Sequence, residues 1–160
     1  MRKIFVILLL VFGVTLLISF TKNYSAKNQV EYNNQNDSLK KDRAKYIAII
    51  NNQIKGKEKM QVDSVFENLK VLGGFPAENL VFAMEAWSKG LGVSCGHCHN
   101  TTNFASDEKP KKEISREMVK MGNMISTQIR TIKGLSERPI VNCITCHRGA
   151  LKPAYRMPEK

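Results

Sequence analysis

The sequence predicts an all-α domain that follows an N-terminal apolar segment. Three observations support this prediction. Apolar residues recur at helical spacing through most of the chain, no stretch alternates polar and apolar residues as a strand does, and no strand–helix–strand pattern is present. With 160 residues, the chain has room for one modest domain and some additional segments.

The N-terminus has the composition of an export signal. Arg2 and Lys3 precede an uncharged apolar run, residues 4–20, and this order is typical of a secretory signal peptide. The run is close to the ~20 residues that a membrane-spanning helix needs, and no good small-residue cleavage site follows it. We therefore assign residues 1–22 to a signal peptide or membrane anchor, with the basic residues kept inside the cell.

The next segment, residues 23–45, is predicted to form a polar tether. Much of it is Asn-rich and aperiodic, so it buries too little apolar area to fix its own fold. A helix is predicted from Leu39 to about Gly56, because isoleucines recur there at helical spacing. The folded domain is assigned to residues 46–155.

Two further helices carry the pattern most clearly. Pro76 suits the first position of one helix, and Gly90 is predicted to end it. Its apolar stripe comprises Leu80, Met84, Trp87 and Leu91. Pro110 is predicted to open the other helix and Gly134 to end it. The apolar face of that helix carries Ile114, Met118, Met121, Ile125, Gln128 and Ile132.

Two Cys-x-x-Cys-His motifs account for all four cysteines of the chain. A zinc ribbon also uses two Cys-x-x-Cys pairs, but they usually lie ~15–20 residues apart, much closer than Cys98 and Cys143. Disulfides and thioredoxin-like redox pairs leave the histidines unexplained. Covalent haem attachment explains every residue, with the cysteines bonded to the porphyrin and the histidine below the iron. The predicted haem-binding residues are Cys95, Cys98 and His99, then Cys143, Cys146 and His147.

The sixth ligand of each iron decides the chemistry. The third histidine, His97, lies between two attachment cysteines and cannot easily reach the distal face. Methionine or an open position remains. Met84 is the distal candidate for the first haem. Met118, Met121 and Met124 are candidates for the second, and Met121 is preferred because it is the most central.

The choice of ligand separates two classes of protein. His/Met ligation fills the coordination sphere and raises the reduction potential, which predicts an electron carrier and not an enzyme. An open site instead predicts a di-haem peroxidase-like enzyme, and a structural zinc protein is the third alternative. The net charge of +11 suits an acidic protein partner or anionic lipid, or is simply a solvated surface. Arg148 and nearby lysines could pair with haem propionates. Nucleic acid is not expected as a partner of an exported chain.

The segment from Val65 to Pro153 resembles the cytochrome c subunit family of photosynthetic reaction centres, particularly small di-haem relatives in non-photosynthetic bacteria. The most specific pieces are "LGVSCGHCHN", "NFASDEKPKKEISREM" and "VNCITCHRG". The resemblance implies a di-haem domain in which a methionine-bearing helix precedes each Cys-x-x-Cys-His. It pairs Met84 with the first motif and Met121 with the second.

The sequence differs from the large photosynthetic subunit, which carries four haems, because it contains two motifs. We therefore expect an exported, periplasmic di-haem cytochrome c, anchored to the inner membrane if its signal is retained. It would carry single electrons between membrane or periplasmic redox proteins.

Overall fold

A computed structural model describes Lys22, Tyr24, Lys27, Glu31, residues 33–135 and residues 139–153. The chain divides into two compact units, Met1–Ser38 and Leu39–Lys160. The predicted signal or anchor run, residues 4–20, lies outside the described residues. Among the residues that are described, none of the helices combines the length and the hydropathy needed to span a bilayer.

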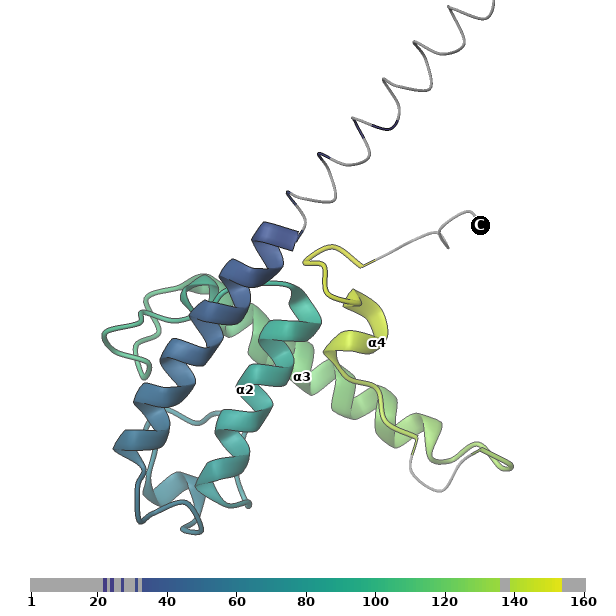
Figure 1. Cartoon of the computed structure of the whole chain (residues 1–160). Helices are drawn as coiled ribbons and strands as arrows, with labels where there is room; N and C mark the ends of the chain where they lie inside the picture. The colour runs from purple at the N-terminus through teal and green to yellow at the C-terminus, as the bar shows by residue number, and fades with distance from the viewer. Residues whose placement is uncertain are drawn as a thin grey trace, which may run out of the picture. The chain divides into compact units, whose positions relative to one another are not determined.

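The second unit is helical, as predicted (Figure 1). Its first helix covers residues 39–53, and residues 33–38 of the first unit are helical as well. The longer helices that follow are α2, Ala77–Leu91, and α3, Pro110–Ile129, and the short helix α4 spans Cys143–His147. Two 3₁₀ turns, η1 at Val62–Ser64 and η2 at Cys95–His97, complete the order. Within the described ranges there is no strand, only two isolated bridges.

Helix α2 begins and ends at residues that favour those positions. Pro76, the predicted first residue, is instead the N-cap, so the helix begins one residue later, and Glu78 lies in the first turn, where a carboxylate is favourable. The C-cap is Gly92, with φ 64°, a left-handed conformation that glycine adopts without strain. The prediction that Gly90 ends the helix is wrong, because Gly90 is a buried residue of the last turn.

Helix α3 begins at Pro110 as predicted, but it ends at Ile129 and not at Gly134. The apolar residues of the predicted face are exposed, whereas Lys112, Arg116 and Ser126 are buried. The reason is that the buried cations are neutralised and hydrogen-bonded by the loop before the helix, which the periodicity of apolar residues cannot reveal. The exposed apolar residues of this face include Ile114, Met118, Met121 and Ile125.

A small apolar core lies where η1 meets the start of α2. Val62 and Ala77 are 0% exposed, and burying a valine side chain completely contributes about 1.5 to 3 kcal/mol. Backbone hydrogen bonds fix this region: Val62 N–H donates to the Phe75 carbonyl at 3.0 Å, and Ala77 N–H to the Met60 carbonyl at 2.9 Å. The core therefore anchors the start of α2, so that the rest of this helix is free to border a cavity.

Candidate functional site

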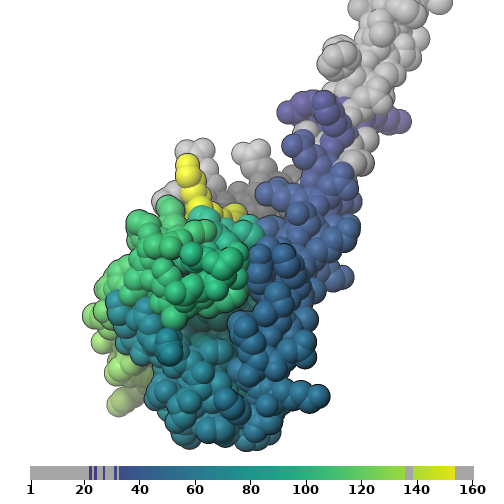
Figure 2. Space-filling view, turned by 90° about the vertical axis from the view of Figure 1, so that its left-hand side faces the viewer, coloured from purple at the N-terminus to yellow at the C-terminus, as the bar shows by residue number. Residues whose placement is uncertain are grey.

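A cavity of about 450 Å³ opens within the second unit, a size typical of cofactor sites, which span ~300–1,000 Å³. Its walls come from the first helix, the irregular segment 65–72, α2, the first motif and the start of α3. Figure 2 shows the hollow between the blue first helix and the green loop that follows the first motif. The predicted residues of the first site all line it: Met84, Cys95, Cys98 and His99.

The 3₁₀ turn η2 presents the first motif to the cavity. Its N-cap, Ser94, makes no side-chain capping bond. Instead, the Asp42 carboxylate accepts a hydrogen bond from the Cys95 N–H at 2.8 Å. Asp42 falls within the range 23–45 that the sequence analysis assigned to a tether, yet here it contacts the haem-binding motif. Sequence reasoning missed this residue, since nothing in the spacing of Asp42 points to a partner so far along the chain.

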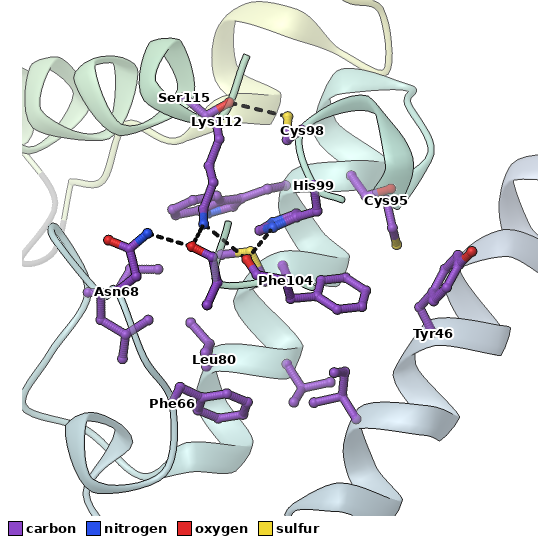
Figure 3. Close-up of a pocket in the computed structure, with 18 of the residues that line it drawn as sticks. Tyr46, Phe66, Asn68, Leu80, Cys95, Cys98, His99, Phe104, Lys112 and Ser115 are labelled. Carbon is purple, nitrogen blue, oxygen red and sulfur yellow. Dashed lines mark hydrogen bonds between the residues drawn. The ribbon is translucent and has the colours of Figure 1, made fainter. Parts of the chain in front are cut away.

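His99 has a defined orientation and tautomer. Its Nδ1 lies 3.1 Å from the Phe104 carbonyl oxygen, and because a carbonyl only accepts, Nδ1 carries the proton and Nε2 keeps its lone pair. The pKa of His99 is lowered, first by burial and then by the charges of Lys112, Arg116 and Lys109. Figure 3 shows the imidazole held beside Phe104. A neutral imidazole with a free Nε2 is what a metal ligand requires.

Aromatic rings and the apolar stripe of α2 surround this imidazole. The ring of Phe104 has its centroid 5.3 Å from that of His99 and 5.7 Å from that of Tyr46, the latter edge to face. The α2 residues predicted to share one stripe do face one cavity: Leu80, Met84, Trp87 and Leu91. The cavity therefore brings together two cysteines, one imidazole and one thioether in a lining that is mostly apolar and carries charged side chains on one side.

A cluster of charges encloses the cavity on the α3 side. Asp107 accepts from Lys70 at 2.8 Å and from Asn68 Nδ2 at 2.8 Å, and it pairs with Arg116 at 2.9 Å and Lys112 at 3.3 Å. These partners, with Lys70 first, hold the pKa of the Asp107 carboxyl well below its usual range. Sequence reasoning missed this cluster. The one signal in the sequence that could have indicated the cluster is the i, i+4 spacing of Lys112 and Arg116, which puts them on one face of a helix.

The second motif forms α4 and has a similar local geometry. Asn142 caps the helix, because its side chain accepts from Thr145 N–H at 3.3 Å and the Thr145 hydroxyl accepts from Asn142 N–H at 3.2 Å. His147 Nδ1 lies 3.1 Å from the Ala150 carbonyl oxygen, so the same argument leaves its Nε2 free. The two motif histidines are thus fixed by backbone carbonyls that follow them in the chain.

Helix α4 packs closely against the end of α2. Gly149 N–H donates to the Gly90 carbonyl at 2.8 Å. A Cβ on Gly90 would lie 3.2 Å from the Cβ of Cys143, and a Cβ on Gly92 would collide with the Gly149 carbonyl. Glycine at these positions therefore lets the backbones of the two motif regions meet.

The methionines predicted for the second site lie on the exposed face of α3. Met118 is 42% exposed, Met121 45% and Met124 72%. Ser126, on the same helix, exchanges hydrogen bonds with the backbone of Val141. This part of α3 therefore lies beside the segment that leads into the second motif. None of the three methionines lines the cavity that receives the first motif.

Two of the four cysteines, Cys95 and Cys143, lie where burial favours the thiol over the thiolate. None of the four forms a disulfide. Burial, and next the Asp42 carboxylate, raise the pKa of Cys95 to about 11, and burial raises the pKa of Cys143. Within the described residues, no three His, Cys, Asp or Glu side chains group as they would around a bare metal ion.

Two Cys-x-x-Cys-His motifs on a helical scaffold, each with a histidine fixed through Nδ1, define a c-type cytochrome domain. The chain belongs to the photosynthetic reaction centre cytochrome C subunit family, whose model matches residues 19–158. The resemblance found in the sequence is thereby confirmed, and membership of a cytochrome c family implies covalently bound haem c.

Three curated relatives carry names of the same kind. The chain is 34% identical over 84 residues to cytochrome c-554 of Chloroflexus aurantiacus, covering 52% of this chain and 20% of that protein. It is 34% identical over 91 residues to the photosynthetic reaction center cytochrome c subunit of Rubrivivax gelatinosus, covering 56% and 24%. For the subunit of the same name from Roseobacter denitrificans, the identity is 28% over 104 residues, covering 62% and 28%. The matched part is thus 20–28% of each relative's length.

Proposed function

We propose that the protein is an exported di-haem c-type cytochrome that carries single electrons between membrane or periplasmic redox partners. One observation carries the proposal: Met84, Cys95, Cys98 and His99 line a single cavity, and the imidazole presents Nε2 because its Nδ1 is hydrogen-bonded. These residues fit haem c in number, type and placement. Bound haem c supplies a one-electron ferric–ferrous couple.

At the first site, the chain's residues have separate tasks. Cys95 and Cys98 would hold the porphyrin by thioether bonds, while His99 and Met84 would fill the two axial positions. A filled coordination sphere leaves no place for peroxide or dioxygen. The apolar residues of α2 and the Phe104 ring, which line the cavity, would limit contact of bound haem with water, and this would favour the less charged, reduced state and so a higher potential.

For the second site, we propose Cys143 and Cys146 as attachment residues, with His147 and Met121 as axial ligands. The exposed apolar face of α3 supports this assignment, because large exposed apolar patches usually mark a binding surface. A second porphyrin attached to α4 would cover part of that face. The exposure of Met121, intermediate among the three candidates, is compatible with a ligand that faces outward from its own helix.

The location of the protein is also a proposal. We assign residues 1–22 to a signal or anchor. The tether predicted over 23–45 is shortened to 23–38 and the cytochrome domain predicted over 46–155 is extended to 39–155, because Asp42 bonds to Cys95 and Arg43 lines the cavity. We propose that this domain lies in the periplasm. Two of the curated relatives are named as reaction center cytochrome c subunits and one as cytochrome c-554, and this chain matches only a minor part of each. We therefore propose respiratory or other periplasmic redox proteins as partners, and not a photo-oxidised pigment.

The test is expression of the full chain in a host competent in cytochrome maturation. A pyridine haemochrome assay and intact mass should give two covalent haems per chain, and the ferric spectrum should be low-spin and unchanged by cyanide. A colourless protein would contradict the proposal. One high-spin haem that takes up cyanide or peroxide would instead support a peroxidase-like enzyme.

A further inference from the structure

The Phe104 carbonyl oxygen accepts two hydrogen bonds from different directions. One comes from His99 Nδ1 at 3.1 Å and the other from Lys112 Nζ at 3.0 Å. Figure 3 shows the Lys112 side chain extending from α3 towards the Phe104 carbonyl, which His99 also contacts. A single peptide oxygen thus joins a buried ammonium group to the proposed axial histidine of the first haem.

Lys112 is held in this position by several contacts. Lys112 as a whole is 9% exposed. Besides the Phe104 carbonyl, its Nζ donates to the carbonyls of Ala105 and Ser106, each at 2.9 Å. Three carbonyl acceptors match the three N–H groups of an ammonium ion, so this geometry requires the charged form. Asp107 lies 3.3 Å away, but it also pairs with Lys70 and Arg116, so its charge is divided among three cations.

The charge affects His99 in two ways that act in the same direction. An ammonium group bonded to the Phe104 carbonyl makes that oxygen a poorer acceptor for the Nδ1 proton, so the imidazole donates less electron density through Nε2. The same positive charge disfavours the ferric state, which carries one more positive charge than the ferrous state. Outer partners of a metal ligand are known to tune the metal in this manner.

We propose that Lys112 is a positioning residue that raises the reduction potential of the first haem by acting on His99 through the Phe104 carbonyl. The inference rests on the proposed function of the first site, and it adds a residue that is neither an attachment residue nor an axial ligand. Lys112 acts on one of the two sites, so its removal should change one of two potentials.

The experiment compares Lys112→Met with Lys111→Met in the haem-loaded full chain. Both variants remove one positive charge from adjacent positions of α3, but Lys111 is exposed, whereas Lys112 is buried. Lys112→Met should lower the potential of one haem by an amount equivalent to a tenfold change in the ferric-to-ferrous ratio, about 59 mV for one electron. Lys111→Met should leave both potentials close to those of wild type. Lys112→Arg keeps the positive charge, so both of its potentials should also lie close to those of wild type.

A second readout separates this effect from a structural one. In the ferrous protein, the NMR signal of the His99 Nδ1 proton should move downfield in Lys112→Met, because its carbonyl acceptor has lost a competing donor. If Lys112 only fixes the loop, the hydrogen bond loosens and the signal moves upfield, which overturns the inference. If Lys112→Met does not fold, the comparison of Lys112→Gln with Lys112→Arg gives the same contrast.

The two proposals fail in distinguishable ways. A wild-type protein without covalent haem overturns the proposed function and this inference with it. A haem-loaded Lys112→Met protein with two unchanged potentials overturns the inference alone.

Discussion

The Asp42 carboxylate and the Cys95 backbone N–H, far apart in the chain, meet at 2.8 Å. The acidic side chain performs the task of an N-cap for the turn that carries the first motif, whose own N-cap residue makes no such bond. The first helix is therefore part of the haem-binding region through a specific contact as well as through its apolar side chains.

Asp42→Ala tests that contact. The variant should lose about 0.5 to 2 kcal/mol of the free energy of unfolding, the range for removal of a capping side chain. Asp42→Asn keeps an oxygen acceptor and should lose less. Denaturant titration followed by circular dichroism measures both, and equal stability of Asp42→Ala and wild type would show that the bond does not form in solution.

Gly90→Ala tests the packing of α4 against α2. The added methyl group would lie 3.2 Å from both the Cβ of Cys143 and the backbone N of Ile144, and overpacking of this kind typically costs about 1 to 3 kcal/mol. Gly122→Ala is the matched control on α3, because its nearest described neighbour is the Val141 carbonyl at 3.6 Å. That control should gain up to about 1 kcal/mol from helix propensity. Thermal unfolding of the two variants should therefore shift in opposite directions.

Met84→Leu tests the distal ligand of the first haem. Leucine fills similar space but offers no sulfur, so one haem should become high-spin in the ferric state and bind cyanide. Its reduction potential should also fall, because His/Met ligation raises the potential. Met60→Leu is the control, since Met60 is 45% exposed and does not line the cavity. An unchanged spectrum for Met84→Leu would assign the ligand to another residue.

Asp107→Asn tests the charge cluster through its pH dependence. The native pKa of Asp107 is depressed below the ordinary 3.8, so the carboxylate stabilises the fold above that value. This stabilisation is lost as the pH falls through 3.8 towards the native pKa. The variant should be less stable than wild type near neutral pH and should lose less stability on acidification below about pH 4.

The control for Asp107→Asn is Glu117→Gln. It removes the same charge from an ion pair with Lys120 in which both side chains are more than half exposed, and such pairs contribute little. Unfolding curves near pH 7, 5 and 3 are the measurement. Parallel curves for Asp107→Asn and wild type across this range would rule out the role assigned to the cluster.

The fold class and the first site could be predicted because their signals are local. The stripe that includes Met84 and Trp87 repeats at helical spacing, and the motif with His99 is a contiguous pattern. For α3, sequence reasoning predicted the start at Pro110 but not the burial of Lys112 and Arg116. A cation is assigned to solvent unless its partners are known, and here most of the partners lie in segments before the helix.

Polar contacts within and around the motifs could not be predicted either. Thr145 lies between two attachment cysteines, where the motif accepts any residue, yet it forms the reciprocal cap with Asn142. Asp42 acts on a residue far along the chain. Both roles depend on backbone N–H groups left without helical partners, and a one-dimensional pattern does not show which side chain will reach them.

The hydrogen bond from Gly149 to Gly90 has a consequence for how homologous chains can vary in length. Because the end of α2 meets α4 backbone to backbone, an inserted or deleted residue between positions 90 and 95 would shift the first motif relative to the second. The exposed residues 130–135 that follow α3 carry no such restriction. When relatives are aligned, insertions and deletions should therefore occur in the loop at 130–135. They should not occur in the short connection before Cys95.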